Sequence, residues 1–264
     1  MTAADYLGGV VAAEMPASFE LEALKAQAVA ARTYCVAGGT TYSQAHPLAQ
    51  VCTDSACCQA WVSREEATAK WGAEATVYAQ RITQAVAQTD GLGVVYNGQP
   101  IQALFFSSAP GQTTDARAVW GEAVPYLVAV ASPEGDEVPD YRSRLTLSAG
   151  EVKKLILEQY PGADLSGTPE SWLTNVVREP SGVISCLNVG GVPMKGGELR
   201  KLLGLRSACF TLSVAGDQLT FHVTGYGHGV GMSQYGANAM AREGKTFREI
   251  LAWYYTGTQV ALLW

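Results

Sequence analysis

The chain has 264 residues, of which 48% are hydrophobic and 16% are charged; this is the composition of a globular protein that can bury a sizeable core. A net charge of -6 and the lack of a long Lys/Arg run exclude an electrostatic interface for nucleic acid. No stretch reaches the roughly 20 apolar residues of a membrane span, and no signal-peptide pattern opens the chain.

The N-terminal segment predicts a pair of helices. Pro16 ends the first helix, and Ser18 is a candidate N-cap for the second, whose apolar residues recur with helical spacing along 21–34. Since Met1 leads almost directly into a helix, we expect an address or anchor segment to precede it in the full-length protein. Four residues share one face of the first helix and place an acid on an apolar stripe: Leu7, Val10, Val11 and Glu14.

The middle of the chain contains a loop, a hairpin and a helix. Residues 46–61 show no regular hydrophobic periodicity, as expected of a loop that is organised by its own ligands. Asn97-Gly98 favours a hairpin turn between strands at 94–96 and 101–106. Ser148 and Glu151 form a capping box ahead of a helix that reaches about Tyr160.

The last third alternates β-rich runs with turns and ends in two helices. Gly216-Asp217 closes the final hairpin, and helices are predicted near 233–242 and 247–255. We therefore predict a single mixed α+β unit over residues 1–264, with the option of an inserted helical subdomain at about 140–170. The expected strands are 173–178, 183–189, 209–214 and 218–224.

Glu14 is the first candidate for chemistry. Its sequence neighbours are aliphatic and offer no charge partner. Desolvation would then raise its pKa, as a general acid near neutral pH requires. An exposed acid at a helix end is the alternative.

A group of soft ligands is the second candidate. His46, Cys52, Cys57 and Cys58 lie within thirteen residues and suit a closed tetrahedral zinc site. An extracytoplasmic disulfide and a plain reduced loop are the competing interpretations. The other three cysteines are expected to be small buried hydrophobic residues without a function: Cys35, Cys186 and Cys209.

The third candidate is the glycine run at 225–236, GYGHGVGMSQYG. Alternating glycines let the backbone approach a ligand closely, and they place His228, Ser233 and Gln234 beside a helix N-terminus. The spacing fits neither the dinucleotide fingerprint nor a nucleophile elbow. A hydrolase using Ser233 and His228 is therefore a minor alternative, and a purely structural glycine corner stays open.

The fourth candidate follows the second hairpin strand. Ser107, Ser108 and Thr114 could line a sugar site, although Ser and Thr after a strand commonly serve in turns.

Together these segments resemble the stage II sporulation protein D family of lytic transglycosylases. Three motifs carry most of the resemblance: Glu-Met-Pro at 14–16, Ala-Arg-Thr-Tyr at 31–34 and the glycine run. The chain departs from the family pattern at Cys57, where a second His is expected, and at 109–112, where a glycine pair is expected. The matching segments are 6–16 (YLGGVVAAEMP), 24–34 (LKAQAVAARTY), 59–61, 105–136, 199–210, 225–237 and 250–257.

The resemblance implies an enzyme of the cell envelope that acts during sporulation engulfment. Glu14 would be the catalytic acid, which cleaves the bond between N-acetylmuramic acid and N-acetylglucosamine in denuded peptidoglycan and leaves 1,6-anhydro ends. A peptidoglycan amidase would be the partner. The sole cofactor would be a structural zinc ion held by His46 and the three nearby cysteines. The protein would be extracytoplasmic and held at the membrane through the preceding anchor. The glycan would contact His228, Ser233, Gln234, Tyr235, Ser107, Ser108 and Thr114.

A second function fits the same resemblance, because some relatives stimulate an amidase. In that case the chain would bind glycan strands without cutting them.

Overall fold

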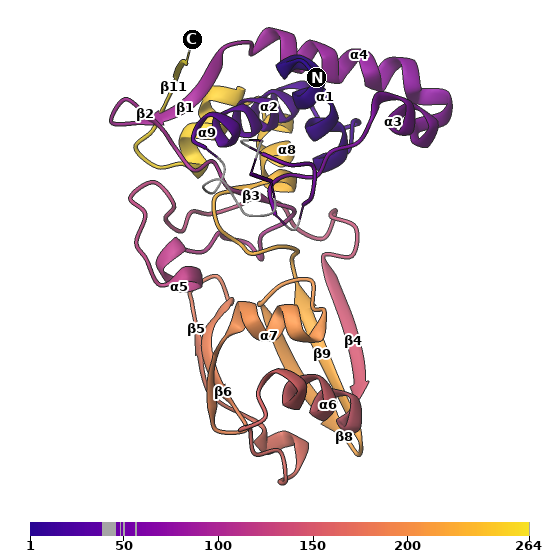
Figure 1. The fold of residues 1–264 in the computed structure, drawn as a ribbon, viewed down its shortest axis with the longest axis vertical. Helices are drawn as coiled ribbons and strands as arrows, with labels where there is room; N and C mark the ends of the chain where they lie inside the picture. Colours follow the sequence, from indigo (N-terminus) through magenta and orange to yellow (C-terminus); the bar gives the residue numbers. More distant parts are fainter. Residues whose placement is uncertain (39–45, 48, 50, 56, 264) are drawn as a thin grey trace. The chain divides into compact units, whose positions relative to one another are not determined.

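The computed structural model describes residues 1–38, 46–47, 49, 51–55 and 57–263 (Figure 1). The chain forms two compact units. Unit 1 consists of Met1–Phe105 and Ala237–Trp264, and unit 2 consists of Phe106–Gly236. Among the described residues, no helix has both the length and the apolar character that a bilayer crossing requires.

Unit 1 is built around one alanine-rich helix, α2, which contacts α1, α4, α9 and the strand β1. Most of α2 is buried, since its alanines let neighbours approach from several sides. A small antiparallel sheet in the order β11-β1-β2 completes the unit. Its helices are α1 (Ala3–Glu14), α2 (Leu21–Val36), α3 (Arg64–Trp71), α4 (Ala75–Gln88), α8 (Gln234–Arg242, which starts at the end of unit 2) and α9 (Phe247–Tyr254); its strands are β1 (Leu92–Tyr96), β2 (Gln99–Pro100) and β11 (Gln259–Leu262).

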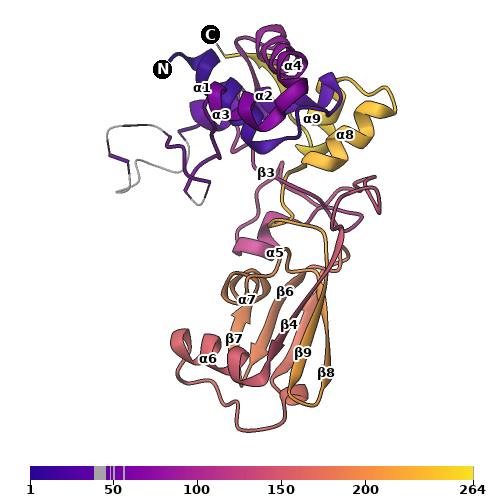
Figure 2. The ribbon, with the colours of Figure 1, turned by 90° about the vertical axis from the view of Figure 1, so that its right-hand side faces the viewer.

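Unit 2 contains two antiparallel three-stranded sheets, in the orders β4-β9-β8 and β5-β6-β7 (Figures 1 and 2). Both sheets share one hydrophobic core with two helices, to which Ile156, Leu187, Leu199 and Phe221 contribute. The elements are β3 (Phe105–Phe106), α5 (Ala116–Trp120), β4 (Arg142–Ser148), α6 (Ala149–Gln159), β5 (Leu173–Arg178), β6 (Ile184–Val189), β7 (Val192–Lys195), α7 (Gly196–Leu203), β8 (Phe210–Ala215), β9 (Gln218–Thr224) and β10 (Met232–Ser233), which pairs with β3.

The mixed α+β class is confirmed, with the predicted helical pair at the N-terminus and the predicted helices at the C-terminus. Asn97 and Gly98 have φ of 49° and 77°, as the predicted hairpin turn requires. The capping box of Ser148 and Glu151 is also present. The predicted subdomain at 140–170 holds β4 and α6, which are both parts of unit 2.

Two local predictions were wrong. Ser18 does not cap α2; the N-cap is Glu20, whose backbone N–H donates to the side chain of Asn238 from α8. The second hairpin strand is only Gln99–Pro100, because proline removes a ladder donor, and β3 pairs with β10 instead.

Candidate functional site

Glu14 is the last residue of α1, and its side chain is half-buried. The backbone N–H of Ala60 donates to its Oε1 at 2.8 Å. This bond favours the carboxylate, whereas the negative end of the helix dipole favours the neutral acid. The carboxyl group therefore combines partial exposure with a backbone donor on one oxygen.

Four ligand atoms gather beside this helix. Those of His46, Cys52, Cys57 and Cys58 all lie within 4.8 Å of one another, so the cluster could hold a metal ion. The sulfur atoms of Cys57 and Cys58 are 3.8 Å apart, and Cys58 Sγ is 3.3 Å from His46 Nε2. An edge of about 3.8 Å is what a tetrahedron with metal–sulfur bonds of about 2.3 Å has.

Hydrogen bonds around the cluster affect the protonation of its ligand atoms. His46 Nδ1 is 2.9 Å from the carbonyl oxygen of Ala49, so Nδ1–H donates there and Nε2 is left to bind. A backbone hydrogen bond at Asp54 lowers the pKa of Cys52. A hydrogen bond with Cys52 in turn raises the pKa of Cys57 to about 11. The Cys57 thiol thus retains a proton that a bound metal ion would replace.

All six cysteines are free thiols. The expectation of a buried hydrophobic residue is wrong for Cys186, which is exposed on β6. Strand alternation explains the difference, because Leu187, the next residue, takes the core-facing position.

The glycine run brings the third and fourth candidate segments together within unit 2. Gly225, Gly227, Gly229 and Gly231 have φ of 78°, 117°, 85° and 79°. A Cβ on Gly225 would lie 2.7 Å from the Ser108 carbonyl oxygen. Ser108 and Tyr226 exchange backbone hydrogen bonds of 3.0 and 2.9 Å. The glycines therefore let residues 106–114 pack closely against the glycine run. That contact, rather than a ligand, accounts for the spacing of the glycines.

Most of the polar side chains in these two segments are buried. Ser108, Thr114, Ser233 and Gln234 are at most 5% exposed, whereas Ser107, His228 and Tyr235 are half-buried. The Thr114 hydroxyl lies 2.9 Å from that of Ser181. Buried hydroxyls of this kind shape the segment more than they reach outward.

His228 lies between two aromatic rings. Its ring centroid is 5.6 Å from that of Phe106 and 5.5 Å from that of Trp120. The Val230 N–H donates to Nδ1 at 3.2 Å, so the proton of the neutral ring is on Nε2. The exposed Trp120 and this half-buried imidazole together present an aromatic surface.

Comparison with known proteins identifies the family. A family model described as stage II sporulation protein matches residues 1–96. The chain is 42% identical to stage II sporulation protein D of Bacillus subtilis (strain 168), across 97% of this chain and 74% of the relative. The chain belongs to the stage II sporulation protein D family.

Two further relatives extend the match. Stage II sporulation protein D of Bacillus amyloliquefaciens is 38% identical, across 97% of this chain and 73% of that protein. A Bacillus subtilis protein named amidase enhancer is 30% identical, across 96% of this chain and 40% of its own length. Membership of the stage II sporulation protein D family supports a role at the cell envelope in sporulation.

Sequence reasoning missed Glu134, a buried acid that joins the segment at 105–136 to the glycine run. It is 4% exposed, and its Oε1 accepts the Ala109 N–H at 2.6 Å and the hydroxyl of Ser233. Its Oε2 is buried and has no hydrogen-bond partner among the described residues. Its position within the family-like segment 105–136 was the one available signal.

The same contacts bear on Ser233. Its hydroxyl donates to a carboxylate and lies 3.3 Å from the Ser107 carbonyl oxygen. A hydroxyl engaged in this way is not one that an imidazole activates, which argues against the Ser/His hydrolase.

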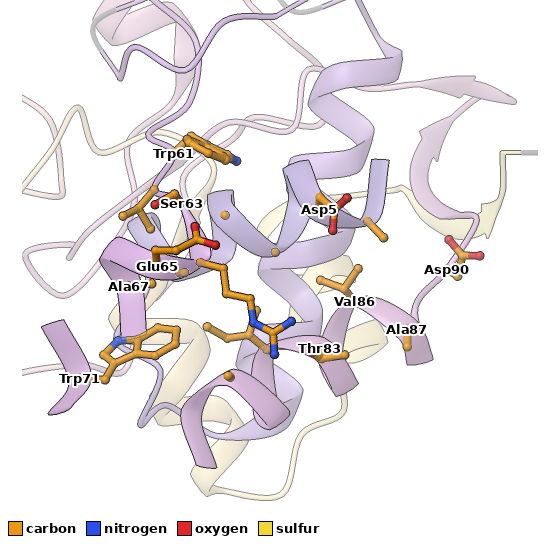
Figure 3. Close-up of a pocket in the computed structure, with 18 residues that line it drawn as sticks. Asp5, Trp61, Ser63, Glu65, Ala67, Trp71, Thr83, Val86, Ala87 and Asp90 are labelled. Atoms are coloured by element: carbon orange, nitrogen blue, oxygen red, sulfur yellow. The ribbon is translucent and has the colours of Figure 1, made fainter. Parts of the chain in front are cut away.

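A cavity of about 690 Å³ lies elsewhere in unit 1, between α1, α3 and α4 (Figure 3). Its wall includes Trp61 and Trp71 as well as the acids Asp5, Glu65 and Asp90. Trp61 follows Ala60 directly, so the cavity adjoins the segment that holds Glu14.

Proposed function

We propose that the chain is a lytic transglycosylase that cleaves denuded peptidoglycan between N-acetylmuramic acid and N-acetylglucosamine. The observation that carries the proposal is Glu14, a half-buried carboxyl group at a helix end with one oxygen on a backbone N–H. The two relatives named stage II sporulation protein D support it, since they match almost the whole chain.

The chemistry needs one carboxyl group for two proton transfers. Protonated Glu14 gives its proton to the glycosidic oxygen as the bond from that oxygen to C1 of the muramic acid breaks. The C6 hydroxyl oxygen of the same sugar then bonds to C1, and its proton passes to the Glu14 carboxylate. No water is consumed, and the acid is regenerated. The Ala60 N–H stabilises the carboxylate formed between these steps.

Residues of unit 2 supply the glycan contacts in this proposal. His228 and Tyr235 are the half-buried members of the predicted set that carry rings, and Trp120 adds an exposed ring beside His228. Ser107 is half-buried as well, while Ser108, Thr114, Ser233 and Gln234 act from within by holding the glycine run in shape.

The metal in this proposal is a structural zinc ion. Three thiolates and one imidazole are the donors that zinc prefers, and their separations fit a tetrahedron. The ion would fix the segment that includes Cys52, whose carbonyl oxygen accepts the Tyr6 hydroxyl at 3.3 Å. It would hold structure and take no part in proton transfer.

A binding function is the second candidate. The observation in its favour is the relative named amidase enhancer, which matches 96% of this chain. The chain would then hold glycan strands outside the cytoplasm, at the membrane, and present them to a peptidoglycan amidase.

One experiment separates these functions. Purified protein is incubated with amidase-treated sacculi, and the products are analysed by mass spectrometry. Anhydro ends are the expected result. Reducing ends would identify a hydrolase instead, and bound but uncut strands would identify the enhancer.

A further inference from the structure

The segment that holds Glu14 runs along α1 and is attached to it twice. The Ala60 N–H donates to Glu14 Oε1 at 2.8 Å, and the Val62 N–H donates to the Gly9 carbonyl oxygen at 3.3 Å. Trp61 is the residue between these two attachments. A shift of Trp61 would therefore act on the peptide that carries the Ala60 amide through a single intervening bond pair.

Trp61 is seated on a bare patch of α1 backbone. A Cβ on Gly9 would lie 2.1 Å from Trp61 Nε1 and 2.6 Å from its Cδ1. Glycine in a helix interior costs about 1 kcal/mol relative to alanine. Gly9 lies within α1 and its φ is not in the left-handed region, so the close approach of the indole is what requires glycine. Gly8, the preceding residue, has nothing within 4 Å of its Cβ position.

The polar atom of the indole does not hold the ring in place. Its Nε1 is buried and has no hydrogen-bond partner among the residues that the structure describes. The side chain also lines the 690 Å³ cavity (Figure 3). The contact with Gly9 therefore holds the ring by close packing and not by a hydrogen bond from Nε1.

Gln59, the residue before Ala60, fixes the other end of the segment. Gln59 is 1% exposed, and its Nε2 lies 3.4 Å from Cys35 Sγ of α2 and 3.5 Å from the Tyr6 hydroxyl of α1. The segment is therefore anchored on both sides of Ala60, by a polar contact before it and by an indole on a glycine after it.

We propose that Trp61, seated on Gly9, is a positioning residue that aims the Ala60 N–H at Glu14 and so fixes the catalytic carboxyl group. This inference rests on the proposed function for its effect on catalysis. Its geometric part does not, because the Ala60 amide reports on the contact whether or not the chain cuts glycan.

The test uses adjacent glycines as a matched pair. Gly9→Ala places a methyl group where the indole lies, whereas Gly8→Ala adds the same group in open space. The amide proton of Ala60 is followed by NMR, with Glu14→Ala marking its resonance when the acceptor is absent. We expect Gly9→Ala and Trp61→Ala to move this resonance toward the Glu14→Ala position and Gly8→Ala to leave it in place. Cleavage should fall about 10-fold or more in the first two variants, since small misplacements of a catalytic group can cost this much.

A double variant guards against trivial misfolding. In Gly9→Ala/Trp61→Ala the methyl group meets no indole, so its Ala60 resonance and activity should equal those of Trp61→Ala alone. An unchanged Ala60 resonance in folded Gly9→Ala and Trp61→Ala would overturn the proposal, as would equal losses in Gly8→Ala. A moved resonance in a protein that releases no anhydro ends would overturn the proposed function and support the positioning contact.

Discussion

Glu14 in unit 1 and Glu134 in unit 2 are both carboxyl groups that accept a backbone N–H, yet their surroundings suit them to different roles. Glu14 is half-buried at a helix end, where a sugar oxygen could reach it. Glu134 is 4% exposed and joins Ala109 to Ser233, so a substrate cannot approach it without displacing both. Under the proposed function, access rather than hydrogen bonding separates the acid for chemistry from the acid for structure.

Removing Glu134 gives the largest expected loss of stability. Glu134→Ala leaves the buried Ala109 N–H and the Ser233 hydroxyl without this hydrogen-bond acceptor. It should lower the free energy of unfolding by about 3 kcal/mol. Glu14→Ala should change it by less than about 1 kcal/mol, because that side chain is partly in water. Urea unfolding measures both. Equal losses in the two variants would remove the distinction between these acids.

The metal cluster gives the next largest effect. We expect close to one zinc ion per chain by elemental analysis, and a stabilisation of about 3 kcal/mol at a free zinc concentration 100 times the Kd. A chelator should therefore lower the melting temperature. Cys58→Ser should abolish this response, whereas Cys186→Ser, on an exposed strand position, should keep it. A metal-free protein that melts at the same temperature with or without chelator would refute the zinc site.

A glycine in unit 2 provides a smaller effect. Gly227 has φ of 117°, and its Cβ would lie 2.7 Å from Phe106 Cβ. Gly227→Ala should cost about 2 kcal/mol, from backbone strain together with displacement of the His228 segment. The control is Gly111→Ala, which has φ of 87° but nothing near its Cβ position, and so isolates the strain. A cost no greater than that of the control would mean that close packing on Phe106 contributes nothing.

The smallest effect comes from an exposed carboxylate, Glu151. Hydrogen bonds from the backbone and side chain of Ser148 lower its pKa. A lowered folded-state pKa means that this contribution is present above the unfolded-state pKa and is lost as the pH falls through the folded-state value. Ser148→Ala should lower the melting temperature slightly at neutral pH, because it removes the capping hydroxyl. Thermal unfolding from pH 3 to pH 7 should show the difference between variant and wild type shrinking in acid; a constant difference would contradict the pKa shift.

The sequence predicts elements whose signals are local. Helical spacing around Glu14, the Asn97-Gly98 turn and the Ser148–Glu151 box all depend on residues at most seven positions apart, and each is present in the structure. The signal of the His46 and cysteine cluster is also local, since its ligands lie within thirteen residues of the sequence.

What the sequence did not predict depends on partners far apart in the chain. Asn238 accepts the Glu20 N–H at the start of α2 across 218 residues, and Ser233 donates to Glu134 across 99 residues. The Ala60 N–H that holds Glu14 is 46 residues from it. No period or motif records such pairings, because they arise only when the core packs.

The central claim concerns the proton of Glu14, and one substitution tests it most directly. Glu14→Gln keeps the size of the side chain and an oxygen for the Ala60 N–H, but it removes the acid. The variant and the wild type are compared on amidase-treated sacculi, with release of 1,6-anhydro products measured by mass spectrometry and folding by circular dichroism. The account predicts at least a 1,000-fold loss of release, about 4 kcal/mol of barrier, in a folded protein. Release by Glu14→Gln within 10-fold of the wild type would contradict it.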